Sequence, residues 1–306
     1  MKKLAVVFIS LSLLLFLGAC SMQPPEWAKP AKKEDLKDIK IGLSVSTLNN
    51  PFFVSLKDGV QKEAKTMGIQ VKIVDAQNDS AKQINDVEDL IQQGVDLLLI
   101  NPTDSAAIST AVQSANNIGI PVVTLDRSAE KGKVATLVAS DNIKGGEMAA
   151  EYIVKKLGEN VQVAELEGVP GASATRERGK GFHNIADKKL KVTDKQSADF
   201  DRTKGLTVME NLLQANPDIK AVFAHNDEMA LGAIEAINSS GKDIMVIGFD
   251  GNDDALNAIK AGKMEATVAQ QPDLIGKLAV EAGIDVLQGK KVSKNIPAPL
   301  KLVVKE

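Results

Sequence analysis

Cysteine is almost absent from this chain, which has a single one, Cys20, among its 306 residues. A lone cysteine excludes an internal disulfide framework and a thiolate metal site, because both need several cysteines. The folded part of the chain must therefore be held together by the packing of its side chains.

Aromatic residues are scarce, and neither sign of charge is in large excess. Phe, Trp and Tyr make up 3% of the chain, so a Phe in a polar stretch stands out. The formal net charge is −3. This balance gives no support for nucleic-acid binding, which requires a basic patch. The rest of the composition, with 44% hydrophobic and 25% charged residues, is that of an ordinary globular protein.

Motifs of common enzymes are absent or broken. The segment 171–175 lacks the second glycine of a nucleophile elbow. After Gly179 and Gly181, Asn184 stands where a dinucleotide-binding fingerprint requires glycine. No phosphate-binding loop is present, and His183 and His225 lack metal-ligand spacing. We therefore expect neither an enzyme nor a bound cofactor or metal ion.

The N-terminus has the pattern of a secretory signal. Lys2 and Lys3 precede an apolar stretch over 4–17, and small residues lead to Cys20. The stretch is shorter than the roughly 20 residues of a membrane-spanning helix. A cysteine at the cleavage point resembles a bacterial lipobox, in which the thiol receives a lipid. We expect a signal peptide over 1–19, export, and anchoring to the outer face of the cell membrane through Cys20; an ordinary cleaved signal with an incidental cysteine is the alternative.

A polar segment over 20–39 follows the cleavage point. It has three prolines, many charges and almost nothing to bury, which is typical of a solvated tether. Trp27, the only Trp, lies in it. This residue either contacts a membrane surface or is a lone exposed aromatic residue, and the sequence leaves both open.

From Ile41 onward, short apolar runs alternate with longer amphipathic stretches. The runs predict strands, and the stretches predict helices. Their alternation predicts parallel sheets covered by helices, and two doubly wound sheets suit the length better than one large sheet. The expected strands are 41–46, 71–74, 96–100, 121–125, 133–139, 161–166, 220–224, 244–249 and 265–269; the expected helices are 54–67, 81–93, 105–117, 145–157, 203–214, 227–239 and 273–287.

Polar side chains follow directly after most of the expected strands. In an open α/β sheet a ligand binds beyond the carboxyl ends of the strands, so these side chains are candidates for a site. They are amides, carboxylates and guanidinium groups, each able to contact two adjacent hydroxyls, with phenylalanines among them. Such a set suits a polyol, with forked polar groups around its rim and apolar rings against its C–H faces.

Some of these polar residues have a simpler structural explanation. Asp104, Asp141 and Asp227 each follow a strand and fit the position of a helix cap, and we assign them that role. Asn101 fits a plain turn. His225 either touches a ligand or is a surface or packed histidine, and we favour the second interpretation.

Eight motifs carry a resemblance to a known family. They are VSTLNNPFFVSLKDG (45–59), LLINPTDS (98–105), VTLDR (123–127), RERG (176–179), ADFDR (198–202), FAHNDEMALGA (223–233), GFDG (248–251) and ATVAQQPD (266–273). In these motifs the chain resembles the ribose-binding proteins of bacterial ABC importers, within the type I group of periplasmic binding proteins. The resemblance covers about 40–306.

The resemblance implies which residues bind the ligand. The residues that hydrogen-bond to the ligand would be Asn50, Asp126, Arg127, Arg178, Asn226, Asp250 and Gln270. The aromatic rings that stack on the ligand would be Phe52, Phe53 and Phe200. Two further residues, Asn101 and Phe249, would lie in a second layer behind these. The chain departs from the family pattern at His225, where we expect Gln, and at Gln271, where we expect Leu. Both positions neighbour expected pocket residues, so they bear on fine specificity.

The resemblance also implies a fold and a function. The expected fold is α/β: two similar doubly wound parallel-sheet lobes joined by a hinge that the chain crosses three times. One lobe would comprise 40–140 plus 271–299, and the other 141–270 plus 300–306. A neutral monosaccharide, with D-ribose as the first candidate, would bind between the lobes and close them. The closed monomer would then deliver the sugar to an ABC permease with a separate ATPase subunit, because this chain has no ATP site.

Three other functions are compatible with at least part of this pattern. A sensor that reports a sugar to a membrane receptor or kinase would have the same pocket, as would a binder of another pentose or hexose. The ligand-binding core of a repressor shares the fold, but the signal peptide and the lack of a basic helix-turn-helix argue against it.

Overall fold

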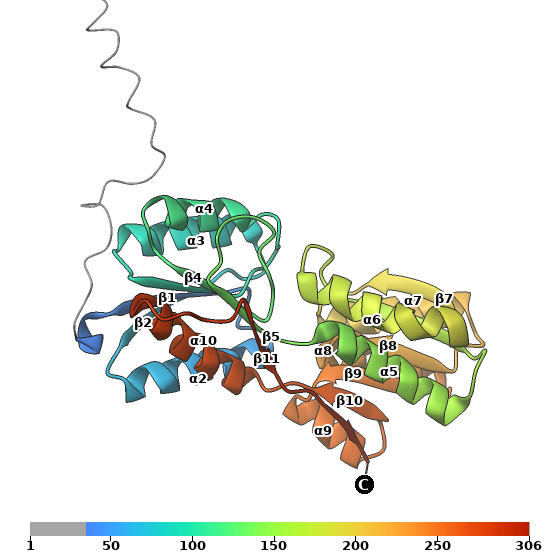
Figure 1. Cartoon of the computed structure of the whole chain (residues 1–306). Coiled ribbons are helices and arrows are strands. Elements are labelled where there is room, and N and C mark those ends of the chain that lie inside the picture. Colours follow the sequence, from blue (N-terminus) through green and yellow to red (C-terminus); the bar gives the residue numbers. More distant parts are fainter. Residues whose placement is uncertain (1–34, 306) are drawn as a thin grey trace, which may run out of the picture.

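The computed structural model describes residues 35–305, which form two α/β lobes side by side (Figure 1). The predicted signal peptide, Cys20, Trp27 and most of the predicted tether lie outside the described residues. The described end of the tether forms a short 3-10 helix, η2 (Leu36–Asp38). Within 35–305, no helix combines the length and the apolar character needed to cross a membrane.

The first lobe is built on a six-stranded sheet with the strand order β11-β5-β4-β3-β1-β2. All its strand pairs are parallel. Helices α2 and α10 cover one face of the sheet and α3 and α4 the other. The elements are β1 (Lys40–Val45), α2 (Pro51–Thr66), β2 (Gln70–Asp75), α3 (Ser80–Gln92), β3 (Leu97–Ile100), α4 (Ser109–Asn117), β4 (Val122–Leu125), β5 (Thr136–Ser140), α10 (Pro272–Leu287) and β11 (Asn295–Ala298).

The second lobe repeats this plan with the strand order β12-β10-β9-β8-β6-β7. Helices α5 and α6 cover one face, and α7, α8 and α9 the other. The elements are α5 (Asn142–Leu157), β6 (Gln162–Glu167), α6 (Ser173–Lys189), β7 (Lys191–Ser197), α7 (Arg202–Ala215), β8 (Ala221–Ala224), α8 (Asp227–Ser240), β9 (Met245–Asp250), α9 (Asp253–Lys260), β10 (Ala266–Ala269) and β12 (Lys301–Val304).

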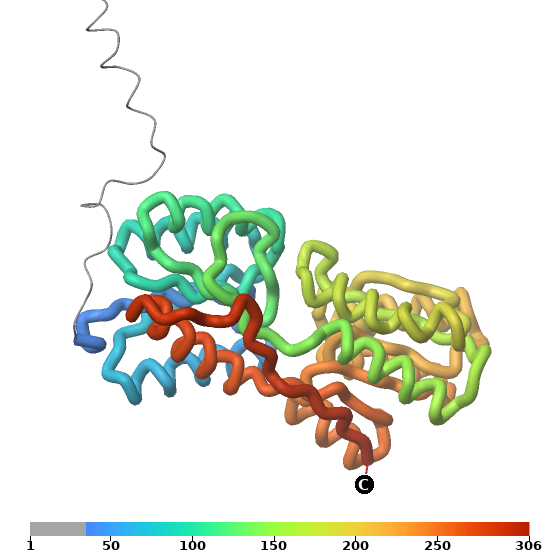
Figure 2. The backbone as a smooth tube through the Cα atoms, viewed as in Figure 1, coloured from blue at the N-terminus to red at the C-terminus, as the bar shows by residue number. Residues whose placement is uncertain are grey.

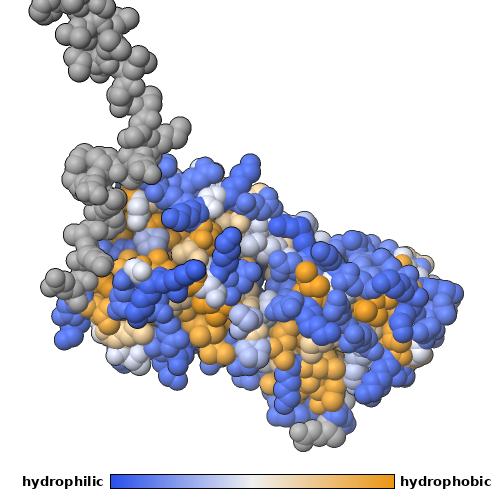
Figure 3. Space-filling model, viewed as in Figure 1, coloured by the Kyte–Doolittle hydropathy of each residue, from blue (hydrophilic) through white to orange (hydrophobic). Residues whose placement is uncertain are grey.

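Both sheets are buried on their two faces. In β3, Leu97 and Leu99 pack into the core on one side, while Leu98 and Ile100 pack into the core on the other. This explains the continuous apolar runs in the sequence. Hydrophilic side chains cover most of the face shown in Figure 3, and among the described residues Ile118 and Leu157 are the large hydrophobic side chains that are exposed.

The chain crosses between the lobes three times, as predicted (Figure 2). It passes from β5 to α5, from β10 to α10, and from β11 to β12. The last crossing adds one antiparallel pair to the predicted parallel sheets: β12 is antiparallel to β10, while the other strand pairs of the second sheet are parallel. The chain runs from the edge of one sheet directly onto the edge of the other, and this path fixes the direction of β12.

The sequence pattern did not predict two helices and three strands: α6, α9, β7, β11 and β12. Helix α6 has nine glycine or charged residues and only four apolar ones, so it shows no apolar stripe. Helix α9 is only 8 residues long. Strand β7 has the polar sequence KVTDKQS because it lies at the edge of its sheet. Strands β11 and β12 are also at the edges and only 4 residues long. An edge strand with one partner needs little apolar surface, which removes the signal used to find it.

Candidate ligand-binding site

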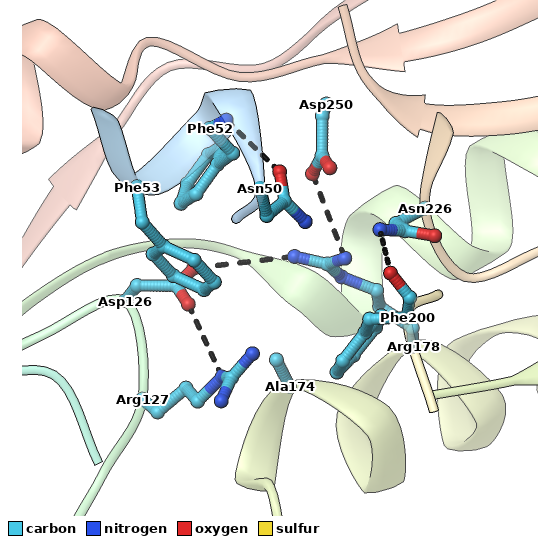
Figure 4. A pocket seen from close by; sticks show the side chains of 10 residues that line it. All are labelled: Asn50, Phe52, Phe53, Asp126, Arg127, Ala174, Arg178, Phe200, Asn226 and Asp250. Carbon is cyan, nitrogen blue, oxygen red and sulfur yellow. Dashed lines mark hydrogen bonds and ion pairs between the residues drawn. The ribbon is translucent and has the colours of Figure 1, made fainter. Parts of the chain in front are cut away.

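A pocket lies between the lobes, at the carboxyl ends of the strands (Figure 4). It encloses about 220 Å³ that protein atoms do not fill, counting the part open to solvent. Nine of the twelve residues predicted from the sequence line it, and Ala174 is an addition. The lining residues are Asn50, Phe52, Phe53, Asp126 and Arg127 from the first lobe and Ala174, Arg178, Phe200, Asn226 and Asp250 from the second.

The ends of the strands bring these residues together. Asn50 follows β1 closely, Asp126 and Arg127 follow β4, Asn226 follows β8, and Asp250 ends β9. Parallel strands end at the same edge of their sheet, and the two sheet edges face each other across the cleft. Residues far apart in the sequence therefore share one small space.

Three lining residues have a left-handed backbone. The φ angles are 63° at Asp126, 61° at Phe200 and 125° at Asp250. Such conformations cost on the order of 1–3 kcal/mol each and persist where the surroundings over-determine them, often at functional sites. Asp tolerates this region better than other residues, so Phe200 is the least expected of the three. The backbone strain at these three residues is consistent with a functional site, where the direction of a side chain is maintained at a cost in local stability.

The two asparagines of the pocket also cap helices. Asn50 begins α2, and its Oδ1 accepts a hydrogen bond from the Phe52 amide at 2.9 Å. Asn226 begins α8, and its Oδ1 accepts from the Met229 amide at 3.0 Å. Its Nδ2 donates to the Phe200 carbonyl at 3.2 Å. The helices occupy the oxygen end of each amide. The NH₂ group is therefore the part that remains available, and in Asn226 one of its two hydrogens already bonds to the Phe200 carbonyl.

Four buried charges, two of each sign, occupy the pocket. Asp126, Arg127, Arg178 and Asp250 are each no more than 4% exposed. The ion pairs among them are long: 3.5 Å from Arg127 Nε to Asp126 Oδ2, 3.7 Å from Arg178 Nη1 to Asp250 Oδ1, and 4.0 Å from Arg178 Nη2 to Asp126 Oδ1. The charges neutralise one another without using up their hydrogen-bonding capacity.

Burial shifts the titration of these groups. It raises the pKa of Asp126 and of Asp250, against the attraction of the neighbouring guanidinium groups. It lowers the pKa of Arg127 to about 10. Asp126 Oδ1 and Arg127 Nε are buried, and although each takes part in a long ion pair, neither has a hydrogen-bond partner among the described residues. Such atoms are usually paired, so a ligand with hydroxyl groups would satisfy them.

Aromatic rings hold the two arginines in place. The Arg127 guanidinium lies 5.0 Å from the centre of the Phe53 ring and 5.1 Å from that of Phe200, which belong to different lobes. The Arg178 guanidinium lies 3.8 Å from the centre of the Phe249 ring. Cation–π attraction of this kind stabilises a desolvated cation.

Three predicted residues do not line the pocket but support residues that do. Phe249 packs against Arg178, as described above. Asn101 accepts hydrogen bonds from Ser46 and donates from Nδ2 to the Leu125 carbonyl at 3.1 Å and to Asp126 Oδ2 at 3.4 Å. It is therefore more than a plain turn residue. Gln270 Nε2 donates to Asp250 Oδ1 at 2.8 Å, while its buried Oε1 has no partner among the described residues.

Two of the three helix-cap assignments from the sequence are wrong. Asp227 does not cap a helix, since Asn226 is the cap of α8. The Asp227 carboxylate is instead fully buried and bonds to the loop after β9. Asp104 is not the cap of α4 either, because the helix begins after Ile108; Asp104 accepts from two backbone amides in the turn before the helix. Asp141 caps α5 as predicted.

His225 is a packed histidine rather than a residue of the pocket. Its ring is fully buried, and its Nε2 lies 2.8 Å from Glu165 Oε1. Its carbonyl accepts a hydrogen bond from Arg178 Nη1 at 2.5 Å. The hydrogen bond between this residue and a pocket arginine is therefore made by its backbone carbonyl.

Two similar α/β lobes with a polar, charge-neutral pocket between them define a two-lobed binding protein for a small solute. A family model described as a periplasmic binding protein domain matches residues 41–291. The chain belongs to this family, which also agrees with the predicted fold class.

Relatives of known function cover the whole chain. The ribose import binding protein of Bacillus subtilis is 75% identical over 302 residues, or 99% of each chain. The ribose import binding protein of Escherichia coli is 52% identical, covering 100% of this chain and 99% of that protein. These relatives are binding proteins of importers, and the chain is accordingly a binding protein and not an enzyme.

Solved structures show the same fold. The Caulobacter myo-inositol binding protein with bound myo-inositol has a TM-score of 0.83 and 33% identity, covering 87% of this chain and 93% of that one. A solute-binding protein of an ABC transporter from Mycobacterium smegmatis with bound glycerol has a TM-score of 0.84 and 37% identity, covering 87% and 94%. Both ligands are neutral polyols.

Proposed function

We propose that this protein is a lipid-anchored extracytoplasmic receptor that binds D-ribose between its lobes and delivers it to an ABC importer. The observation that carries the proposal is the pocket itself. Nine predicted residues from both lobes converge on it, and its four buried charges balance. The 75% identity with a ribose import binding protein supports ribose as the sugar.

The charge balance argues for a neutral ligand. Asp126 and Asp250 stand against Arg127 and Arg178, and each charge has an opposite charge nearby. A phosphate or a carboxylate would bring an unpaired negative charge into a buried site, which is strongly unfavourable. Hydroxyl groups, by contrast, both donate to the carboxylates and accept from the guanidinium groups.

The position of the pocket explains how binding would drive closure. A ligand that touches Asn50 and Asp126 on one side and Arg178 and Asn226 on the other interacts with both lobes only when they are close together. It therefore has a higher affinity for the closed form and shifts the equilibrium toward it. The permease would then distinguish loaded from empty protein by the closed arrangement of the two lobes.

The lipid anchor on Cys20, the solvated tether and the monomeric state belong to the same proposal. The signal-like N-terminus and the cysteine at its end support the anchor. In cell fractionation, Cys20→Ser should leave the membrane or accumulate as an uncleaved precursor. Mature, membrane-bound Cys20→Ser protein would contradict the anchor and leave the sugar site untouched.

A second candidate function is sugar sensing. A fructose-binding periplasmic domain of a hybrid two-component system shares the fold, with a TM-score of 0.83 and 28% identity. The same closed form that a permease recognises would also suit a receptor. Uptake of labelled ribose by cells with and without the gene for this protein separates the two functions, because a pure sensor leaves uptake unchanged.

Calorimetric titration of the protein without its lipid tests the sugar. The panel comprises D-ribose, D-allose, L-arabinose, myo-inositol and ribose 5-phosphate. We expect D-ribose to bind most tightly and ribose 5-phosphate to bind far more weakly. Tighter binding of the phosphate would overturn the neutral-pocket argument, and tighter binding of another neutral sugar would replace ribose but keep the site.

A further inference from the structure

Asp227 is a buried carboxylate with three hydrogen bonds, and it does not line the pocket. Its Oδ2 accepts from the Gly251 amide at 2.7 Å and from the Asn252 amide at 2.8 Å. Its Oδ1 accepts from Thr267 Oγ1 at 2.7 Å. The side chain is fully buried and is not among the residues that line the pocket. It therefore joins the start of α8 to the loop after β9 and to strand β10.

The two amides held by Asp227 belong to a strained turn. They come directly after Asp250, whose φ is 125°, and Gly251 itself has a φ of 80°. A residue with a Cβ avoids the conformation seen at Asp250 unless neighbouring groups impose it. The carboxylate of Asp227 is such a group, because it fixes the direction of the two peptide planes that follow.

Asp250 is the residue whose direction this turn decides. Its carboxylate faces the pocket, where Oδ1 lies 3.7 Å from Arg178 Nη1 (Figure 4). The same oxygen accepts a hydrogen bond from Gln270 Nε2 at 2.8 Å. If the turn relaxed, φ at Asp250 would return toward ordinary values and its side chain would leave this position. Gln270 and Arg178 would then lose their partner.

The sequence of β9 makes room for Asp227. A Cβ on Gly248 would lie 2.3 Å from Asp227 Oδ1, a distance that no real contact allows. The motif GFDG (248–251) thus has one glycine that admits the Asp227 carboxylate and another that makes the turn. Both glycines serve the placement of the Asp between them.

We propose that Asp227 is a positioning residue for ligand binding: it fixes the turn after β9 and so aims the Asp250 carboxylate into the pocket. The proposal rests on the proposed function, since it assumes that Asp250 binds the sugar. It differs from a purely structural role, in which Asp227 stabilises the second lobe without affecting the direction of Asp250.

Two substitutions at Asp227 separate geometry from charge. Asp227→Ala removes both acceptors from the turn. Asp227→Asn keeps the shape, because its amide oxygen can accept from both backbone amides while its nitrogen donates to Thr267. The affinity for ribose should fall about tenfold or more in Asp227→Ala, as expected when a buried bonded partner is removed, and stay within about threefold in Asp227→Asn. An equal loss in both variants would mean that the charge acts, and would overturn the proposal.

A double-mutant cycle tests whether Asp227 acts through Asp250. In an Asp250→Ala background, adding Asp227→Ala should change the affinity little, because no carboxylate remains to be aimed. The same loss of affinity with and without Asp250 would show a structural role only. Tyr152→Phe is the control for stability: it removes a 2.8 Å bond to Glu265 in the same lobe and should leave the affinity unchanged.

Amide hydrogen exchange supplies a measurement that needs no sugar. In Asp227→Ala, the Gly251 and Asn252 amides should exchange faster than in the wild type, whereas Asp227→Asn should protect them. Thr267→Val is the milder variant if Asp227→Ala does not fold, and it should give a smaller change in the same direction. Unchanged exchange at both amides would overturn the positioning role. A wild type that binds no sugar of the panel would overturn the proposed function, and the exchange experiment would still decide the role of Asp227.

Discussion

A single amide at Asn226 serves both the fold and the pocket. Its oxygen caps α8, while its nitrogen reaches the Phe200 carbonyl at the edge of the pocket. The neighbouring Asp227 looks like the better cap in the sequence, because a carboxylate is favoured at the N-terminus of a helix. The backbone shows that Asn226 is the cap, because a capping residue is extended while the next residue is already helical. Asn226 has φ −154° and ψ 169°, and α8 begins at Asp227.

Asn226→Ala should therefore reduce both stability and affinity. Loss of the cap costs about 1 kcal/mol of the free energy of unfolding. Loss of the amide should weaken ribose binding about tenfold, because the groups left in the closed pocket have no replacement partner. Asp79→Ala is the matched control, since Asp79 caps α3 away from the pocket. Titration calorimetry and urea denaturation of both variants should show similar stability losses, but only Asn226→Ala should lose affinity; a near-wild-type affinity would remove Asn226 from the site.

A buried cluster of Glu165, His183 and His225 should make the stability of the second lobe depend on pH. Glu165 is fully buried and lies within hydrogen-bond distance of both His183 and His225. Burial alone would raise the pKa of Glu165, but the hydrogen bonds from the two histidines lower it to about 2. The bond to Glu165, with help from Asp187, raises the pKa of His183 from 6.5 to about 9.

The sign of the effect follows from the raised pKa of His183. Protonated His183 stabilises the folded state, so its contribution is complete below pH 6.5 and is lost as the pH rises to about 9. Urea denaturation should show that stability falls across this window. His183→Gln keeps a donor for Glu165 but cannot titrate, and its stability should change less over the same range. An identical slope in the variant would show that another group is responsible.

At the scale of elements, helix pairs on the sheets pack through glycines. In α5, a Cβ on Gly146 would lie 2.1 Å from the Arg178 carbonyl oxygen, and in α6 a Cβ on Gly181 would lie 1.9 Å from that of Ile143. Similar approaches join α2 to α10 at Gly59 and α7 to α8 at Gly232. The close contact of α5 with α6 sets the position of the turn that carries Arg178.

Gly146→Ala should push this turn away from α5. We expect a stability loss of about 1–3 kcal/mol, as is usual for overpacking, together with weaker ribose binding because Arg178 moves. Gly283→Ala is the matched control: its Cβ would lie 2.3 Å from Leu97 Cδ2 in the first lobe, and neither α10 nor β3 contributes a residue to the pocket. Thermal unfolding and calorimetry should show losses of stability in both variants but a clear loss of affinity only in Gly146→Ala. Equal affinities would mean that the helix pair does not control Arg178.

At the scale of the whole molecule, the lobes touch each other directly beside the pocket. The Ser105 amide donates to the Gly171 carbonyl at 3.0 Å, and the Ser128 amide donates to Ser173 Oγ at 2.9 Å. Arg176 of the second lobe also pairs with Glu130 of the first at 3.1 Å. These bonds exist only while the lobes are close together, so they stabilise the closed form independently of any ligand.

Ser173→Ala should shift the equilibrium toward the open form. A lost hydrogen bond of about 1 kcal/mol lowers the affinity for ribose several-fold, mainly through faster dissociation, although Ser173 does not line the pocket. Arg176→Ala should have a smaller effect, because both partners of that ion pair are 46% exposed. Small-angle scattering should report a more open protein at subsaturating sugar. An unchanged dissociation rate in Ser173→Ala would show that the contact does not contribute to closure.

The sequence by itself determined the main plan of this protein. Apolar runs with helical stretches between them predicted the central strands, because a strand buried on both faces must be apolar. The same alternation located the strand ends, and most of the pocket residues, such as Asp126 and Asn226, follow these ends. The motifs around them were specific enough to indicate the family.

Only the tertiary structure decided what each polar residue does. Asn226 and Asp227 are adjacent and both polar, yet one caps a helix beside the pocket and the other holds a loop 24 residues away. Asn101, Phe249 and Gln270 lie behind the pocket rather than on it, because they contact Asp126, Arg178 and Asp250. Edge strands such as β7 carry no apolar signal, since one neighbour suffices for them. Hydrophobic burial acts on each segment and is therefore visible in the sequence, whereas a hydrogen-bond partner depends on which distant segments the fold brings within 3 Å.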